Sequence, residues 1–165
     1  MNQVAKNILP VLDISFIPPE DIDSVWDIVS KILKRAVKRS YGRMSVIDIY
    51  NNVIDERSHL WVAYNTDTLK IEGCAITQFQ EYPTGLRMLN IDLLAGKKME
   101  DWAHEGLDTL YAWAENNGCD GIEFISRPGF WHWVKHKKGW KKTNVFYEVK
   151  FKEEVVAEVS QLNKL

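Results

Sequence analysis

The 165-residue sequence predicts a mixed α/β fold: an antiparallel meander followed by a strand–helix–strand crossover, with helices on both faces of the sheet. Three strand-like segments follow one another between residues 59 and 95 with short turns between them, and a long segment of helical period precedes a further strand. The length and the 45% hydrophobic content suit one domain with a sizeable core. We therefore expect a single domain over residues 1–165, with its core between about 12 and 151.

A short strand and two helices are expected first. Residues 12–16 alternate apolar and polar side chains, which is the period of a strand. Pro18 and Pro19 suit a helix start, and the apolar residues after them recur at helical spacing as far as Ala36. A second helix is predicted over Val46–Ile54. The candidates for its buried side are Ile47, Ile54 and either Ile49 or Tyr50.

The meander and the long helix come next. The predicted strands are 59–64, 70–82 and 86–95. From Met99 the apolar period becomes 3.6 residues, and Gly118 stands where a glycine ends a helix. The residues expected on the buried face are Met99, Trp102, Ala103, Gly106, Leu107, Leu110, Trp113 and Ala114.

The C-terminal part predicts a strand over 121–126, a short helix from Pro128 to about His136, and a closing strand over 144–151. Residues from Glu153 onward are either a terminal helix or a frayed end.

Composition disfavours several classes of protein. No apolar run approaches the roughly 18 residues that a bilayer-spanning helix needs, and the first residues lack the apolar stretch of a signal peptide. Two cysteines, Cys74 and Cys119, are too few for a disulfide framework or a four-cysteine zinc site. We therefore expect a cytoplasmic protein that does not bind membranes.

The charges are unevenly distributed, although the net charge is only −2. Residues 31–43 and residues 127–142 each hold six basic side chains and no acidic one, whereas acidic residues dominate between 92 and 120. Such asymmetry attracts an anionic ligand to one face. Aromatic residues interleave with lysines over 130–142, but core packing explains most of them, so we do not expect nucleic-acid binding. Seven tryptophans leave an aromatic surface for a protein partner as an alternative.

Two short segments carry a resemblance to a known family. The sequence WAENNGCD at 113–120, before an apolar strand, and KKGW at 137–140, before the last predicted strand, together with the order of elements over 12–151, resemble the GNAT acetyltransferase superfamily. The run from Met99 to Phe151 also resembles diverged GNAT-like proteins of bacteriophages. The resemblance implies that acetyl-CoA lies in a cleft where two neighbouring parallel strands splay apart, and that its acetyl group passes to an amine.

In the family the pyrophosphate binds backbone amides of an R/Q-x-x-G-x-G/A turn that opens the long helix, because glycine permits close approach and a helix N-terminus attracts phosphate. By resemblance this motif falls on Lys98, Asp101 and Ala103. Asp101 departs from the pattern, since a carboxylate replaces glycine there. Two interpretations remain: a shifted anion-binding turn of Gly96, Lys97 and Lys98, or acidic residues that cap the helix in place of a phosphate.

The proton-transfer residues of the family also map imperfectly. The tyrosine that protonates the departing thiolate corresponds to Lys135, which donates a proton only if burial lowers its pKa and is otherwise a solvated charge. Candidate bases for the amine are Asp92 and Glu123, each on a strand beside the implied cleft. Their structural alternative is the solvent face of the sheet.

His132 and His136 have the i, i+4 spacing of some metal sites, but no third ligand is evident nearby, so no metal is expected. The functional expectation is an N-acetyltransferase that uses acetyl-CoA and an unknown amine. The alternative is a catalytically inactive GNAT-fold binding module, or a virion or host-takeover protein of a phage.

Overall fold

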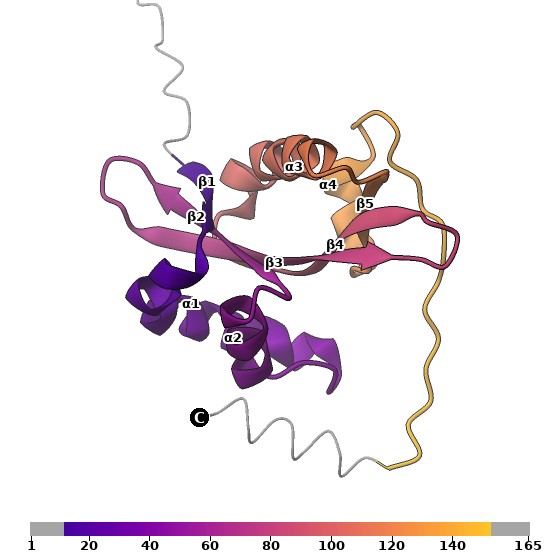
Figure 1. The fold of residues 1–165 in the computed structure, drawn as a ribbon, viewed down its shortest axis with the longest axis horizontal. Coiled ribbons are helices and arrows are strands. Elements are labelled where there is room, and N and C mark those ends of the chain that lie inside the picture. The colour runs from indigo at the N-terminus through magenta and orange to yellow at the C-terminus, as the bar shows by residue number, and fades with distance from the viewer. Residues whose placement is uncertain (1–11, 153–165) are drawn as a thin grey trace, which may run out of the picture.

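The computed structural model describes residues 12–152, which form a five-stranded sheet in the order β1-β2-β3-β4-β5 (Figure 1). The strands are β1 Leu12–Ile17, β2 His59–Asn65, β3 Ile71–Glu81, β4 Arg87–Gly96 and β5 Gly121–Phe124. Consecutive strands are antiparallel from β1 to β4, and β5 runs parallel to β4. The parallel step requires a crossover, which the long helix supplies. The predicted mixed sheet is therefore confirmed.

Helices cover both faces of this sheet, with α1 and α2 on one side and α3 and α4 on the other (Figure 1). The helices are α1 Ile22–Val37, α2 Val46–Ile54, α3 Met99–Asn116 and α4 Trp131–Val134, with single 3₁₀ turns η1 Pro19–Asp21, η2 Lys38–Ser40 and η3 Pro128–Phe130. Ser45 caps α2, because its hydroxyl accepts the N–H of Asp48 at 3.1 Å and donates to the Asp48 carboxylate at 2.6 Å.

The core is divided by the sheet into two large clusters, and a small third cluster contains Leu12, Ala63 and Trp102. The cluster under α1 and α2 contains strand residues Leu60, Val62, Cys74, Ile76, Leu93 and Ala95. The cluster under α3 and α4 contains strand residues Ile14, Trp61, Ala75, Leu89 and Ile91. The α3 face is the predicted one: six of its eight expected residues are buried and Met99 and Trp113 are partly buried. All seven tryptophans belong to one of the three clusters or pack against it.

Trp102 fixes where α3 begins. A Cβ atom on Gly73 would lie 2.5 Å from Cζ2 of Trp102, so the absence of a side chain on β3 lets the indole lie against the sheet. The Trp102 indole N–H also donates to the Lys97 carbonyl at 2.9 Å. The first turn of α3 is thereby held over the end of β4.

The buried side of α2 was predicted wrongly in part. Val46, Ile49 and Val53 are buried, whereas Ile47 is 49% exposed. The apolar residues share one broad side of this short helix, opposite Asp48, Asn51 and Asn52, and Ile47 lies at the edge of that side, next to Asn51, where it reaches solvent. The helix after Pro128 is also shorter than predicted and ends at Val134.

The predicted closing strand over 144–151 is wrong. The segment belongs to no strand, and its apolar side chains are exposed. Instead it lies against the turn after η2, where Glu148 pairs with Arg43 at 2.5 Å and Lys150 donates to the Tyr41 carbonyl. Alternation of apolar residues favours an extended chain, but a strand also needs a neighbouring backbone to bond with.

The tail after residue 152, for which a helix or a frayed end was expected, lies outside the described residues, as do residues 1–11. Among the helices between residues 12 and 152, none has the length and apolar composition needed to cross a lipid bilayer.

Candidate functional site

A β-bulge in β4 marks the centre of the candidate site. Ile76 on β3 pairs with Leu93 on β4, but the next β3 residue, Thr77, pairs with Ile91, so Asp92 is the extra residue. The buried side chains of β4 change sides of the sheet at this bulge. Leu89 and Ile91 lie in the cluster under α3, whereas Leu93 and Ala95 lie in the cluster under α1 and α2. The bulge therefore reverses the strand's alternation at Asp92.

The Asp92 carboxylate sits in a partly desolvated polar setting. Its Oδ1 accepts a hydrogen bond from the Gln78 side-chain amide at 3.1 Å and another from the Asn90 amide. Burial raises the pKa of Asp92 to about 6, against the two amide hydrogen bonds, which lower it. A carboxylate with such a pKa is largely ionised at neutral pH and still basic enough to accept a proton.

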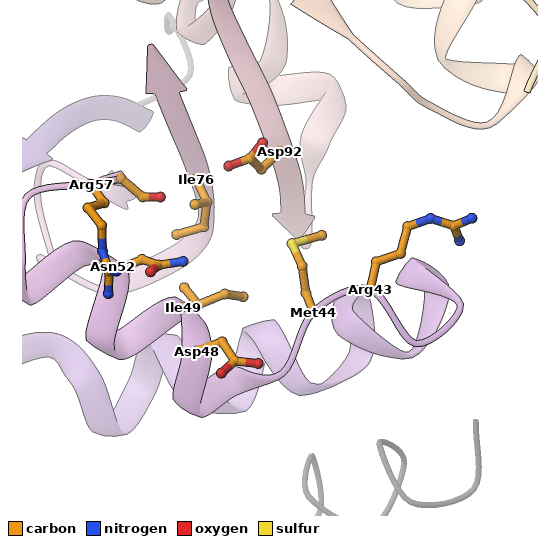
Figure 2. A pocket seen from close by; sticks show the side chains of 9 residues that line it. Arg43, Met44, Asp48, Ile49, Asn52, Arg57, Ile76 and Asp92 are labelled. Carbon is orange, nitrogen blue, oxygen red and sulfur yellow. The ribbon is translucent and has the colours of Figure 1, made fainter. Parts of the chain in front are cut away.

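A cavity of about 380 Å³ opens at Asp92 between the sheet and the α2 side of the molecule (Figure 2). Its lining residues are Arg43, Met44, Asp48, Ile49, Asn52, Arg57, Ser58, Ile76 and Asp92. Figure 2 shows Asp92 projecting from β4 and Asn52 from α2, while the Arg43 side chain extends away from the other lining residues. The cavity thus combines an apolar floor with polar groups from both sides.

Glu123, the other candidate base, lies outside this cavity lining. It stands opposite Asn90 in the parallel β4–β5 pair, and its carboxylate accepts the Tyr82 hydroxyl at 2.7 Å. That hydrogen bond raises the pKa of the Tyr82 hydroxyl. The structure therefore places Glu123 and Asp92 on adjacent strands, with Asn90 between them.

Strands β4 and β5 pair over only part of the length of β4. The parallel register runs from Met88 and Gly121 to Ile91 and Phe124, and β5 ends there. From Asp92 to Gly96, β4 is paired with β3 on one side only, as far as the described chain goes. The unpaired edge of β4 therefore leads from the candidate base to the start of α3.

The turn between β4 and α3 holds three of the predicted cofactor residues. Gly96 has a φ of 135°, and a Cβ there would lie 2.5 Å from the Glu72 carbonyl, so only glycine fits. The Lys97 N–H donates to that same carbonyl at 2.8 Å. Lys98 has a left-handed φ of 54° and precedes the helix as its N-cap residue. Its ammonium lies 3.6 Å from the buried Glu72 carboxylate.

Asp101 and Ala103 lie inside α3. They are the other two residues on which the resemblance places the pyrophosphate-binding motif. The Asp101 N–H donates to the Lys98 carbonyl at 2.9 Å, and Ala103 is buried. Glu100 and Asp101 are in the first turn, where the helix dipole favours acidic side chains. The helix itself supplies no carbonyl for the N–H groups of Met99 and Glu100.

The turn between β4 and α3 has donor groups that suit the pyrophosphate of acetyl-CoA. Lys97 and Lys98 are exposed beside the helix N-terminus, although the Lys98 ammonium also pairs with Glu72, and this end of the helix adjoins the unpaired edge of β4. Backbone amides and ammonium groups are the donors that bind a pyrophosphate. The donor set therefore fits the group, and the Glu100 and Asp101 carboxylates weaken that fit without removing it.

Lys135 lies elsewhere in the molecule. It is an exposed residue at the end of α4, on the face of the sheet opposite to the Asp92 cavity. The structure does not bring it together with Asp92. No group of three or more potential metal-ligating side chains occurs within residues 12–152, and His132 and His136 are both exposed.

Sequence reasoning missed the polar residues around Asp92, namely Gln78, Asn90, Asn52, Ser58 and Arg57. A signal was present in β4, because Asn90 and Asp92 interrupt an apolar run, whereas β3 also contains Thr77, Gln80 and Glu81, so Gln78 does not stand out there. The α2 residues carried no comparable signal.

Solved acetyltransferase structures share this fold. A predicted acetyltransferase from Clostridium acetobutylicum, solved with acetyl-CoA, has a TM-score of 0.61 at 18% identity, over 84% of this chain and 96% of that one. The ribosomal-protein-alanine N-acetyltransferase of Brucella melitensis biovar Abortus 2308 has a TM-score of 0.61 at 16% identity, over 86% and 99% of the two chains. A GNAT family acetyltransferase from Staphylococcus aureus has a TM-score of 0.57 at 9% identity, over 85% and 98%.

No protein-family model matches the sequence, and no curated protein matches it either. Identities this low establish the fold alone, so the chain has the GNAT fold. The resemblance to bacteriophage proteins stays a prediction.

Proposed function

We propose that this protein is an N-acetyltransferase that transfers the acetyl group of acetyl-CoA to an amine, with Asp92 as the general base. The observation that supports this most directly is the position of Asp92: a bulge aims its half-buried carboxylate into a cavity at the point where β4 loses its β5 neighbour. The proposal draws further support from neighbours of the same fold, one of them solved with acetyl-CoA.

Separate groups of residues would bind acetyl-CoA, receive the amine and remove its proton. When bound, acetyl-CoA supplies the thioester that reacts with the amine. The Lys97 and Lys98 ammonium groups and the first-turn amides of α3 would hold its pyrophosphate. The cavity would receive the amine, which is protonated and unreactive in water. Asp92 would take up a proton from it, directly or through a water molecule, so that the nitrogen lone pair becomes available. The nitrogen would then bond to the acetyl carbon as the carbon–sulfur bond of the thioester breaks, and the departing thiolate would take a proton from solvent.

The environment of Asp92 suits that task. Because the Gln78 and Asn90 amides donate to the same oxygen, they orient the carboxyl group and stabilise its charged form. Burial opposes them, and the pKa of about 6 reflects the balance. Glu123 is the second candidate for the base; its carboxylate is already engaged by Tyr82. Lys135 receives no role in this proposal, since it lies on the other face of the sheet.

Two measurements test the proposal. Calorimetry with acetyl-CoA should give saturable binding in the wild type that weakens in Lys97→Ala and Lys98→Ala, with Lys34→Ala on α1 as the control. Release of free thiol from acetyl-CoA in the presence of a panel of primary amines should then depend on Asp92. If acetyl-CoA does not bind at millimolar concentration, the enzyme proposal fails and a non-catalytic module becomes the better account.

A further inference from the structure

The cavity beside Asp92 is lined by charged groups of both signs. Arg43 and Arg57 are basic, and Asp48 and Asp92 are acidic. Which of these charges is available to a ligand depends on the partners that each side chain already has.

Arg43 is committed to the C-terminal segment. Its guanidinium donates to the Ser40 carbonyl at 3.2 Å, pairs with Glu148 at 2.5 Å and lies 4.8 Å from the centre of the Phe146 ring. In Figure 2 its side chain points away from the cavity. Arg43 therefore lines the cavity, but its guanidinium is not available to bind a ligand there.

Asp48 is committed to the start of α2. Its carboxylate accepts the Ser45 hydroxyl at 2.6 Å, and its backbone N–H donates back to that hydroxyl. This capping arrangement satisfies the helix terminus. Figure 2 shows the Asp48 side chain on the far side of Ile49 from Asp92, whereas the Asp92 carboxylate lies near Ile76, so Asp92 is the carboxylate that the cavity offers to a cationic group.

Arg57, at the end of α2, is the available cation. The structure gives its guanidinium one hydrogen bond, to Asp55 at 2.9 Å, between side chains that are 64% and 58% exposed. Exposed ion pairs of this kind contribute little free energy and exchange readily. A guanidinium has five N–H donors in a planar fork, which suits two oxygens of a carboxylate or phosphate.

Asp92 and Arg57 belong to separated parts of the lining. Asp92 lies on β4 and Arg57 in the turn after α2, and in Figure 2 the Ile76 side chain lies between them. The uncharged polar groups of Asn52 and Ser58 complete the α2 side. A cavity of about 380 Å³ is near the lower end of small-molecule sites, which span roughly 300 to 1,000 Å³.

From this arrangement we propose that the amine acceptor also carries an anionic group, a carboxylate or a phosphate, with the amine at Asp92 and the anion at Arg57. The inference rests on the proposed function and narrows its substrate class to small amino acids or amino sugar phosphates and similar molecules. Arg57 is thus a specificity residue. An amine of the same size without an anionic group would contact Asp92 but would lack the contact with Arg57.

Matched acceptor pairs test this proposal. Acetyl transfer is measured with leucine against leucinamide, which differ in a carboxylate, and with glucosamine 6-phosphate against glucosamine, which differ in a phosphate. The ratio of kcat/KM within each pair is compared between the wild type, Arg57→Gln and Arg39→Gln. Arg39 is an exposed arginine in η2, outside the cavity lining, so its variant removes the same charge elsewhere. Intrinsic amine reactivity cancels in this comparison.

The expected result is that Arg57→Gln lowers the ratio of kcat/KM for the anionic over the uncharged acceptor about tenfold in at least one pair, as expected for loss of a hydrogen bond to a charged group. The pair that responds identifies the anion. Arg39→Gln should retain the wild-type ratio. The inference is overturned if Arg57→Gln leaves the ratio of kcat/KM within each pair at its wild-type value.

Calorimetry without acetyl-CoA separates this inference from the proposed function. If no amine is acetylated but leucine or glucosamine 6-phosphate binds in an Arg57-dependent manner, the ligand class stands and the enzyme proposal falls. If amines are acetylated regardless of their anionic group, the enzyme proposal stands and the ligand class falls. Absence of both transfer and binding overturns both.

Discussion

The side-chain amide of Gln78 on β3 donates a 3.1 Å hydrogen bond to the Asp92 carboxylate on β4, across the bulge that displaces Asp92 from the regular ladder. This contact favours the ionised carboxylate, whereas burial favours the protonated one. Gln78 is therefore a positioning residue that also adjusts the basicity of Asp92.

Replacing Gln78 by methionine removes a donor to the charged form while keeping the volume. The pKa of Asp92 should then rise above about 6, by up to about one unit if the lost hydrogen bond contributes near 1.4 kcal/mol. A ¹³C carboxyl chemical-shift titration measures this directly and does not need activity. Gln80→Met is the control, because Gln80 lies two residues further along β3 and its side-chain amide donates to the Glu81 carbonyl. An unchanged titration midpoint in Gln78→Met would contradict the assigned contact.

Asp101 should weaken acetyl-CoA binding, because it brings a negative charge to the first turn of α3. Asp101→Asn should tighten binding about fivefold, since one like-charge contact at a few ångströms in water costs about 1 kcal/mol. Glu105→Gln, in the next turn, should have a smaller effect. Calorimetry at two salt concentrations checks both, because screening should shrink the difference. Equal affinities for wild type and Asp101→Asn at low salt would place the anion elsewhere.

Gly73 should tolerate no side chain. In Gly73→Ala the new Cβ would lie 2.5 Å from Trp102 and 2.9 Å from the Ala95 carbonyl, so the α3 start must shift. We expect a loss of about 1 to 3 kcal/mol in the free energy of unfolding, as for other overpacked sites. Gly129→Ala is the matched control, because nothing lies within 4 Å of its Cβ position. Urea unfolding of the two variants decides the point, and equal stabilities would refute this packing.

His59 should make stability depend on pH. The centre of its ring lies 4.8 Å from the centre of the Phe79 ring and 4.7 Å from the centre of the Trp113 ring. Burial lowers the pKa of His59 below the ordinary 6.5, although its hydrogen bond with Thr77 raises that pKa. The unfolded chain then binds the proton more readily than the folded one, so stability falls as the pH drops below about 6.5.

The variant His59→Phe should be less sensitive to pH over that range, whereas His132→Gln, at an exposed site, should behave like the wild type. Melting temperatures between pH 5 and pH 8 measure the effect. A His59→Phe curve parallel to that of the wild type would show that His59 carries no such linkage.

How far the sequence predicts this fold depends on the length of each pattern. α3 has 18 residues, and its apolar period identified the buried face correctly. α2 has nine, and its apolar side is so broad that Ile47, at the edge of that side, was wrongly assigned to the core. The alternation over 144–151 indicated a strand, but pairing depends on where a neighbouring edge lies, which local pattern does not encode.

The candidate site was predictable to a smaller extent. Acidic residues on strands drew attention to Asp92 and Glu123, but the alternation of Leu89, Ile91, Leu93 and Ala95 reads as one continuous face. The structure divides those four residues between the two clusters, because the bulge intervenes. The register between β3 and β4 decides on which face of the sheet each β4 side chain lies. The sequence does not encode that register locally, so the position of the cavity and the roles of Gln78 and Arg57 could not be inferred from it.

The most direct test of the account is the pH dependence of acetyl transfer in Asp92→Asn, with Glu123→Gln as the matched variant. With saturating acetyl-CoA and an accepted amine, the wild-type rate should rise with pH through a midpoint near 6, since the base must lose its proton. Asp92→Asn should lose about a hundredfold or more of kcat and that midpoint, while Glu123→Gln keeps both. Full activity with the same midpoint in Asp92→Asn, or their loss in Glu123→Gln alone, would contradict the account.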